Sequence, residues 1–357
     1  MATTDESVAT IAFMQRFLTA VTAVTAVAAV ALLGGCVWFG DPEKTPFESP
    51  VLPVLTASEG FGYRIDEFPV AAGEEVQDCY FVTVPGSGAD PIWVGKIVAA
   101  LNPGSHHFNV FRVNTIVSLD GAPGTMVHNG ECFKAPNWAD WPLVVNTQRS
   151  DPDHPVYTWE LPDDVAHRFT PGEKLMLQVH YVNASTQETP YLGKAAINFH
   201  RSNDVGPQEL GTLFRSNQSI RVCQSNPNPT YAGTYAFPPG ANVTIAAANG
   251  HFHSRGKKFE AFVWDGASVV TPPIADRFYE STSWDDPPMA TGLDVAVPSN
   301  GGIWWTCEFV WQEPSVGCDA INALDLSGAN DCCYVFGPKV ESGEHCNVFV
   351  YYWPKVP

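Results

Sequence analysis

Short hydrophobic stretches recur along most of the chain and are separated by Gly, Pro, Asn and Asp. Val, Ile, Phe, Tyr and Trp dominate these stretches, and β-branched and aromatic residues favour strands. Few segments show the 3.6-residue period of an amphipathic helix. The pattern therefore predicts an all-β protein. Strands are expected at 79–84, 93–100, 107–113, 175–182 and 195–201, and then at 234–237, 242–248, 258–264, 302–309 and 347–353.

The expected strands fall into two groups on either side of the segment 203–207, Asn-Asp-Val-Gly-Pro, which has the composition of a linker. A length of 357 residues also favours two domains. We expect an N-terminal domain at 58–203 and a C-terminal domain at 204–357. Each is predicted to be an antiparallel β-sandwich of jelly-roll-like form.

The N-terminal region contains an apolar run that ends in Leu-Gly-Gly-Cys36 and resembles the lipobox of a bacterial lipoprotein. This resemblance implies a signal peptide at 1–36, lipidation of Cys36 and a tether at 37–57. The expected location is the outer membrane, facing the periplasm or the exterior. An uncleaved membrane anchor is the alternative, because the run approaches the length of a membrane span. Translation can start at Met1 or at Met14, since the residues before Met14 are acidic.

The formal net charge of −19 argues against nucleic-acid binding, which needs a basic stripe that this sequence lacks. No motif of serine hydrolases, P-loop or dinucleotide-binding proteins, or zinc proteases is present. Beyond Cys36 the chain has eight cysteines, and an even number outside the cytoplasm indicates disulfides. Their irregular spacing, without a CxxC pair, argues against a structural zinc site.

Histidines carry the clearest chemical signal. His251 and His253 flank one phenylalanine, so on a strand both imidazoles point to the same face and can bind one metal ion. His106 and His107 are adjacent, and joint ligation by such a pair requires a bulge, a strand end or the use of different ring nitrogens. His180 lies in a further strand-like run. The four remaining histidines of the two domains, His128, His154, His167 and His200, are interpreted as structural.

Four motifs in this order, a His-His pair, Leu-Gln-Val-His-Tyr, His-Phe-His-Ser-Arg-Gly-Lys and Glu-His-Cys-Asn, resemble the copper type II, ascorbate-dependent monooxygenases. This is the family of peptidylglycine α-hydroxylating and dopamine β-monooxygenases, and the resemblance spans about 79–352. It implies two copper ions, one per domain, that face each other across a solvent-filled cleft. His106, His107 and His180 would hold the electron-relaying copper. His251, His253 and His345 would hold the catalytic copper that binds dioxygen.

The resemblance also implies two disulfides, Cys79 with Cys132 and Cys307 with Cys346. The other four cysteines, Cys223, Cys318, Cys332 and Cys333, would pair among themselves, and the adjacent Cys332 and Cys333 would take different partners.

The chain departs from the family in two places. His345 stands where the family has a methionine, and a third imidazole favours Cu(II) or Zn(II) more than a thioether does. In the substrate pocket, Asn249 and Phe349 replace an arginine and a tyrosine, while Asn347 matches. Without the arginine, a bidentate clamp on a peptide carboxylate is missing, so peptide amidation is not expected. Gln178, two residues before His180, is the candidate to orient that ring.

These residues predict a copper-dependent monooxygenase that hydroxylates a C–H bond of a small-molecule or peptide substrate with O2 and an external electron donor such as ascorbate. The alternative is a copper-binding surface lipoprotein that keeps the fold without turnover. A third hypothesis is an adhesive or structural protein whose histidines bind zinc incidentally.

Overall fold

The computed structural model describes residues 49–113, 124–128, 132, 141–148, 153–183, 191–322 and 331–357. The proposed signal peptide, Cys36 and most of the tether lie outside these residues. In the described part of the chain, no helix is long and apolar enough to cross a membrane.

The described residues confirm the all-β prediction, and each of the ten expected strands is present with bounds shifted by a few residues. Burial alternates along β7 (Val156–Glu160) and β14 (Thr230–Ala236), whereas β4 (Ser105–Arg112), β9 (Lys174–Val182) and β22 (Asn347–Trp353) are buried along nearly their whole length. Five sheets are found instead of the four that two sandwiches require. Two strand pairs, β8 (Val165–Phe169) with β11 (Gln208–Glu209) and β20 (Cys333–Phe336) with β21 (Gly343–Glu344), are parallel, where only antiparallel pairing was expected.

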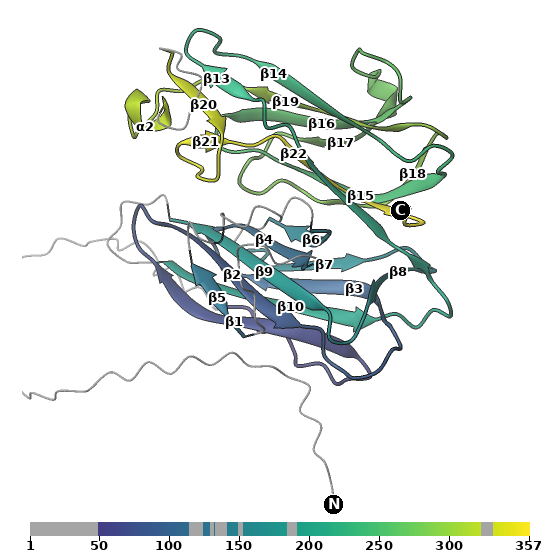
Figure 1. Cartoon of the computed structure of the whole chain (residues 1–357). Coiled ribbons are helices and arrows are strands. Elements are labelled where there is room, and N and C mark those ends of the chain that lie inside the picture. The colour runs from purple at the N-terminus through teal and green to yellow at the C-terminus, as the bar shows by residue number, and fades with distance from the viewer. Residues whose placement is uncertain are drawn as a thin grey trace, which may run out of the picture.

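Two sheets form the first half of the molecule, which lies below the second half in Figure 1. The first sheet contains β1 (Gly60–Val70), β3 (Ile92–Leu101), β7 (Val156–Glu160), β8 (Val165–Phe169), β10 (Tyr191–Arg201) and β11 (Gln208–Glu209). The second contains β2 (Glu75–Thr83), β4 (Ser105–Arg112), β5 (Met126–His128), β6 (Leu143–Thr147) and β9 (Lys174–Val182).

Three sheets form the second half (Figure 1). One contains β12 (Gly211–Ser216), β15 (Val243–His251), β18 (Ala290–Val297) and β22 (Asn347–Trp353). The next contains β14 (Thr230–Ala236), β16 (Gly256–Trp264), β17 (Arg277–Ser281) and β19 (Gly302–Phe309). The small third sheet contains β13 (Arg221–Cys223), β20 (Cys333–Phe336) and β21 (Gly343–Glu344), and the short helices are η2 (Ile274–Asp276) and α2 (Cys318–Asn322).

Two main hydrophobic cores correspond to the two halves. The first lies between the sheets of β1 and β2, but it also includes Ala246, Ala247, Phe349 and Tyr351 from β15 and β22. The main chain N–H of Asn146 donates to the Tyr351 hydroxyl over 2.8 Å. The sheet of β15 and β22 therefore contributes to both cores and joins the halves. The predicted linker at 203–207 precedes β11, which still belongs to the first half.

Candidate metal centre

The first histidine group lies on two neighbouring strands of the second sheet. His107 on β4 faces His180 on β9 in register, and His107 Nε2 lies 3.2 Å from His180 Nδ1. The register of these strands shifts between Ser105 and His107, which is a bulge at His106. Of the three arrangements expected to let the adjacent pair ligate together, the bulge is thus present, and it turns the His106 ring away from the direction that strict alternation would give.

A carboxylate orients His180, and sequence reasoning missed it. His180 Nε2–H donates to Glu75 Oε1 over 2.7 Å, which leaves the Nδ1 lone pair of His180 available to a metal. The same carboxylate oxygen accepts the N–H of Val340, from the other half, over 3.1 Å. Although Glu75 is partly desolvated, its hydrogen bonds to His180 and Val340 lower its pKa. Glu75 begins β2, and in the sequence it had no visible relation to a histidine.

The second histidine group lies where β15 and β21 end. His253 Nδ1–H donates to the carbonyl oxygen of Gly343 over 3.0 Å, because a carbonyl can only accept, and its Nε2 is therefore the available ligand atom. His251 Nε2 lies 2.9 Å from His345 Nδ1, and the rings of His253 and His345 are 4.2 Å apart. The three predicted ligands of this group are thus in mutual contact.

The two histidine groups do not face each other across a solvent-filled cleft, as the family resemblance implied. The centroid of the His106 ring lies 4.9 Å from that of His251 and 5.3 Å from that of His253. Ligand atoms of these three residues lie within 4.8 Å of one another. All six histidines are at most 6% exposed. The bulge explains the difference, because it directs His106 toward the second half. We call the six residues the histidine cluster.

Burial keeps most of the cluster uncharged. It lowers the pKa of His106, His107, His251 and His345 well below the usual value, and the neighbouring imidazoles lower it further. Burial also lowers the pKa of His253 to about 3. Neutral imidazoles are the form that binds a transition metal.

The cluster fits copper or zinc, because two of its buried nitrogens, Nε2 of His106 and Nε2 of His345, have no hydrogen-bond partner. A buried polar atom without a partner is costly and calls for a ligand. The donor set, all imidazole nitrogen, suits Cu(II) and Zn(II).

A chain of buried amides connects the cluster across the two halves. Asn109 Nδ2 lies 3.3 Å from His107 Nδ1 and donates to Gln178 Oε1 over 3.0 Å. Asn146 donates to Asn109, and Asn249 donates to Asn146. Gln178 therefore contacts Asn109 and not His180, and this corrects its predicted role. We call these four residues the amide chain.

A further amide orients the second histidine group. Gln148 Nε2 lies 2.9 Å from His251 Nδ1 and comes from the segment after β6, in the other half. Sequence reasoning missed Gln148 because it lies beyond the end of β6. There the alternation of side chains along a strand no longer predicts which way a residue points.

The three predicted substrate-binding residues have different surroundings. Asn249 belongs to the amide chain. Asn347 and Phe349 line a cavity of about 20 Å³ together with His107, His251 and His345, and this volume suffices for about one water molecule. Phe214 closes the cavity and stacks on Phe349 with ring centroids 4.9 Å apart and planes 9° apart. In this conformation the cavity does not admit an organic substrate.

Beside His345, the fully buried Glu344 organises the backbone around the second group. It accepts the N–H groups of His253 and Arg255, both over 3.0 Å, and pairs with the Arg255 guanidinium at 3.5 Å. Burial raises the pKa of Glu344 to about 7, against the lowering effect of Arg255. Arg255 also lies over the Tyr334 ring at 3.9 Å. Glu344 and Arg255 thus fix the turn that carries His253.

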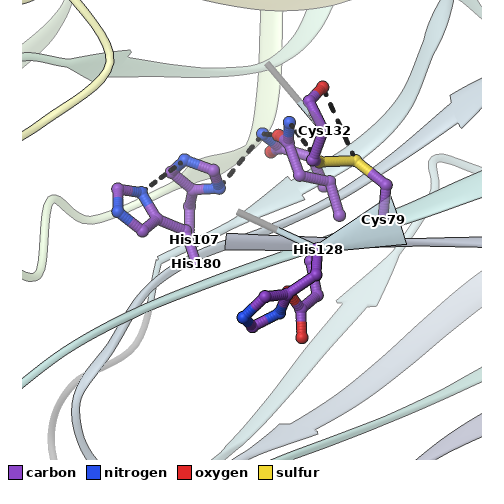
Figure 2. The surroundings of a disulfide bond; sticks show 8 residues. Cys79, His107, His128, Cys132 and His180 are labelled. Atoms are coloured by element: carbon purple, nitrogen blue, oxygen red, sulfur yellow. Dashed lines mark hydrogen bonds and ion pairs between the residues drawn. A yellow bond between two sulfur atoms is a disulfide. The ribbon is translucent and has the colours of Figure 1, made fainter. Parts of the chain in front are cut away.

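The disulfides confirm the expected pairing. Cys79 is bonded to Cys132, to the right of His107 and His180 in Figure 2, and Cys307 is bonded to Cys346, next to His345. The adjacent cysteines take different partners, as expected. These bonds are Cys223–Cys333 and Cys318–Cys332.

The other histidines lie outside the cluster. His128 forms an ion pair with Asp78 and points away from His107 and His180 in Figure 2. His200 lies on β10, His154 is exposed, and His167 is buried in a different region, where it packs edge-on against Trp159.

No family model and no curated protein matches this chain. Among solved structures, the major capsid protein P2 of bacteriophage PM2 aligns with 81% of this chain and 96% of its own length, at 10% identity and a TM-score of 0.29. The STIV MCP aligns with 82% of this chain and 97% of its own, at 9% identity and a TM-score of 0.32. The tandem CBM22 domain of Paenibacillus barcinonensis Xyn10C covers 80% and 81%, at 11% identity and a TM-score of 0.21. Similarity this low assigns neither a fold family nor a function.

Proposed function

We propose that this protein is a copper-dependent monooxygenase that hydroxylates a C–H bond of a small-molecule or peptide substrate. The observation that carries the proposal is the histidine cluster, in which six buried imidazoles from both halves converge. The arrangement of the sheets around two main cores also supports the finer proposal of two jelly-roll-like sandwiches. The lipid anchor at Cys36 and the outer-membrane location remain part of the proposal.

Copper held by the cluster would supply the one-electron chemistry that activates dioxygen. Hydroxylation consumes the C–H bond, one O2, two electrons and two protons, and it yields the alcohol and one water. An external donor such as ascorbate would provide the electrons. Glu75 would hold the His180 ring through its Nε2–H, and the Gly343 carbonyl would hold His253 in the same way. Burial of the cluster would exclude bulk water.

A second candidate function is copper binding without turnover. The cavity of about 20 Å³ favours it, because that cavity excludes an organic substrate from the histidines. His345 in place of a methionine favours it as well, since imidazole supports Cu(I) less than a thioether does.

One experiment separates the two functions. We would measure copper stoichiometry and ascorbate-dependent O2 uptake for the protein and for its His251→Ala, His345→Met and His200→Ala variants. A monooxygenase shows uptake that His251→Ala abolishes and the control His200→Ala leaves intact. Tight copper binding without uptake, with uptake appearing only in His345→Met, assigns the binding function. Failure to bind copper at all overturns both.

A further inference from the structure

A second, larger cavity of about 340 Å³ lies where the two halves meet. It is lined by residues of both halves, among them Arg112 and His167 from the first and Phe214, Arg215 and Tyr235 from the second. Its volume is within the range of small-molecule sites, about 300 to 1,000 Å³. It therefore has room for an organic ligand that the histidine cavity cannot hold.

The charges that line this cavity are mostly positive, although the whole chain carries a net charge of −19. Arg112 is paired with Glu173, and Lys355 is paired with Glu209 over 2.6 Å. Arg215, by contrast, forms no ion pair with any described residue. It donates to the Phe214 carbonyl over 2.9 Å and lies over the Tyr235 ring at 4.7 Å. Glu209 is the carboxylate side chain of the lining, and Pro357, the last residue of the sequence, also lines the cavity.

A buried polar atom in the lining also points to a ligand. His167 is 1% exposed, and its Nε2 has no hydrogen-bond partner. Burial, together with Arg112 and Lys355, lowers the pKa of His167 to about 3, so its ring is neutral at physiological pH. Trp141, Tyr235 and Tyr352 supply apolar and aromatic surface to the same cavity. A cation, an unpartnered imidazole and aromatic walls match a molecule with an anionic group and an aromatic body.

One side chain lies in the walls of both this cavity and the small cavity beside the histidine cluster. Phe214 lines both the larger cavity and the cavity of about 20 Å³ that touches His107, His251 and His345. Phe214 stacks on Phe349 and also packs against the first core, so its ring is held in the walls of both spaces.

We propose that the 340 Å³ cavity binds a small aryl-alkyl carboxylate through Arg215 and that Phe214 divides this site from the histidine cluster. Binding does not depend on the proposed function, because none of the residues that form the cavity is a histidine of the cluster. The partition by Phe214 controls how closely the ligand can approach copper, and this part rests on the proposed function.

Calorimetric titration of the protein without added metal tests the binding. The probe is 3-phenylpropionate, and 3-phenylpropanamide is its neutral counterpart. We expect the carboxylate to bind about ten-fold tighter than the amide, since a charge-assisted hydrogen bond is roughly twice as strong as a neutral one. Arg215→Gln should abolish this difference. Arg201→Gln, which removes the same charge from β10, should preserve it.

Three results overturn the site: no binding of the carboxylate at millimolar concentration, equal binding of carboxylate and amide, or equal weakening by Arg215→Gln and Arg201→Gln. The partition is tested separately with 3-(4-fluorophenyl)propionate on protein loaded with Cu(II) or with Zn(II). Phe214→Ala should increase the copper-induced relaxation of the fluorine signal several-fold, and an unchanged relaxation overturns the partition. If copper does not bind, the proposed function fails while the titration still decides the anion site.

Discussion

The two histidine groups of the cluster are held in different ways. In the first, the carboxylate of Glu75 and the amide of Asn109 orient His180 and His107, and a bulge carries His106. In the second, a backbone carbonyl holds His253, and the Cys307–Cys346 disulfide lies beside His345. Side chains can be repacked more easily than a braced backbone. The first group is therefore the adaptable part of the centre, and the second is its rigid part.

Acid should disrupt both groups, and this is the largest expected effect. Burial lowers the pKa of His106 and His107 in the first group and of His253 in the second. The rings of His253 and of His167, which lies outside the cluster, have a pKa of about 3, whereas the unfolded chain takes up protons near 6.5. The unfolded state thus binds more protons below pH 6.5, and the free energy of unfolding falls as the pH falls toward 3. The rings of His253 and His167 alone should lower the free energy of unfolding by about 5 kcal/mol between pH 6.5 and 4.5, at ~1.4 kcal/mol per pH unit for each ring.

Denaturant titrations of the metal-free protein at pH 7.5, 6.5, 5.5 and 4.5 measure this loss. The stability should be nearly constant above pH 7 and should decrease steadily below pH 6.5. An unchanged denaturation midpoint at pH 4.5 would mean that the rings are accessible to protons in the folded state, and both groups would then be less enclosed than described.

Removing the disulfide of the rigid group should affect both stability and metal binding. The Cys307→Ser, Cys346→Ser variant breaks a disulfide whose cysteines are 39 residues apart in the sequence. It should lose about 4 kcal/mol of unfolding free energy. It should also weaken copper binding, because Cys346 follows His345 directly. Thermal unfolding and a competition titration with a copper chelator measure the two effects.

The matched control is Cys318→Ser, Cys332→Ser. It breaks a disulfide whose cysteines are 14 residues apart in the sequence, and neither cysteine is next to a histidine. This control variant should lose about 3 kcal/mol of unfolding free energy and should bind copper as tightly as the wild type. Equal effects of the two pairs on copper affinity would show that the Cys307–Cys346 bond has no particular role in holding His345.

Glu75→Gln tests the adaptable group and should have the smallest effect of the three. The neutral amide still accepts a hydrogen bond from Val340. It accepts the Nε2–H of His180 less strongly than a carboxylate does, so His180 becomes a weaker ligand for the metal. We expect copper affinity of the first group to fall by about 10- to 100-fold, as for other residues that hold a metal-binding histidine.

Glu74→Gln makes the same change of charge one residue earlier, where the carboxylate accepts the N–H of Ala71 over 2.7 Å. It should leave copper affinity within about two-fold of the wild-type value, since this carboxylate bonds to the backbone of Ala71 and not to a histidine. The site-resolved spectrum of Cu(II) in each variant shows which group has changed. Loss of affinity at the second group in Glu75→Gln would contradict the separation of roles.

The sequence predicted the local part of this site well. The alternating pair His251 and His253 is a pattern of a few residues, and strand geometry alone predicts a shared face for it. The same geometry limited joint ligation by His106 and His107 to a bulge, a strand end or the use of different ring nitrogens. The all-β class and the ten expected strands likewise depend on local alternation.

Contacts that depend on strand register or on docking of the halves could not be predicted. Glu75 reaches His180 only because β2 pairs with β9, and the sequence does not reveal this pairing. Gln178 was assigned to the nearest histidine along its own strand, but Asn109 on β4 lies opposite to it in register and takes its hydrogen bond. The contact of His106 with His251 depends on how two sheets from different halves meet.

The sheet of β15 and β22 has a consequence for how the molecule melts. Because Ala246, Ala247, Phe349 and Tyr351 belong to the core of the first half, separation of the halves would expose apolar surface on both sides. Neither half can then unfold without removing part of the other's packing. Calorimetry should therefore record one cooperative transition instead of two, with the calorimetric and van't Hoff enthalpies equal for the whole chain.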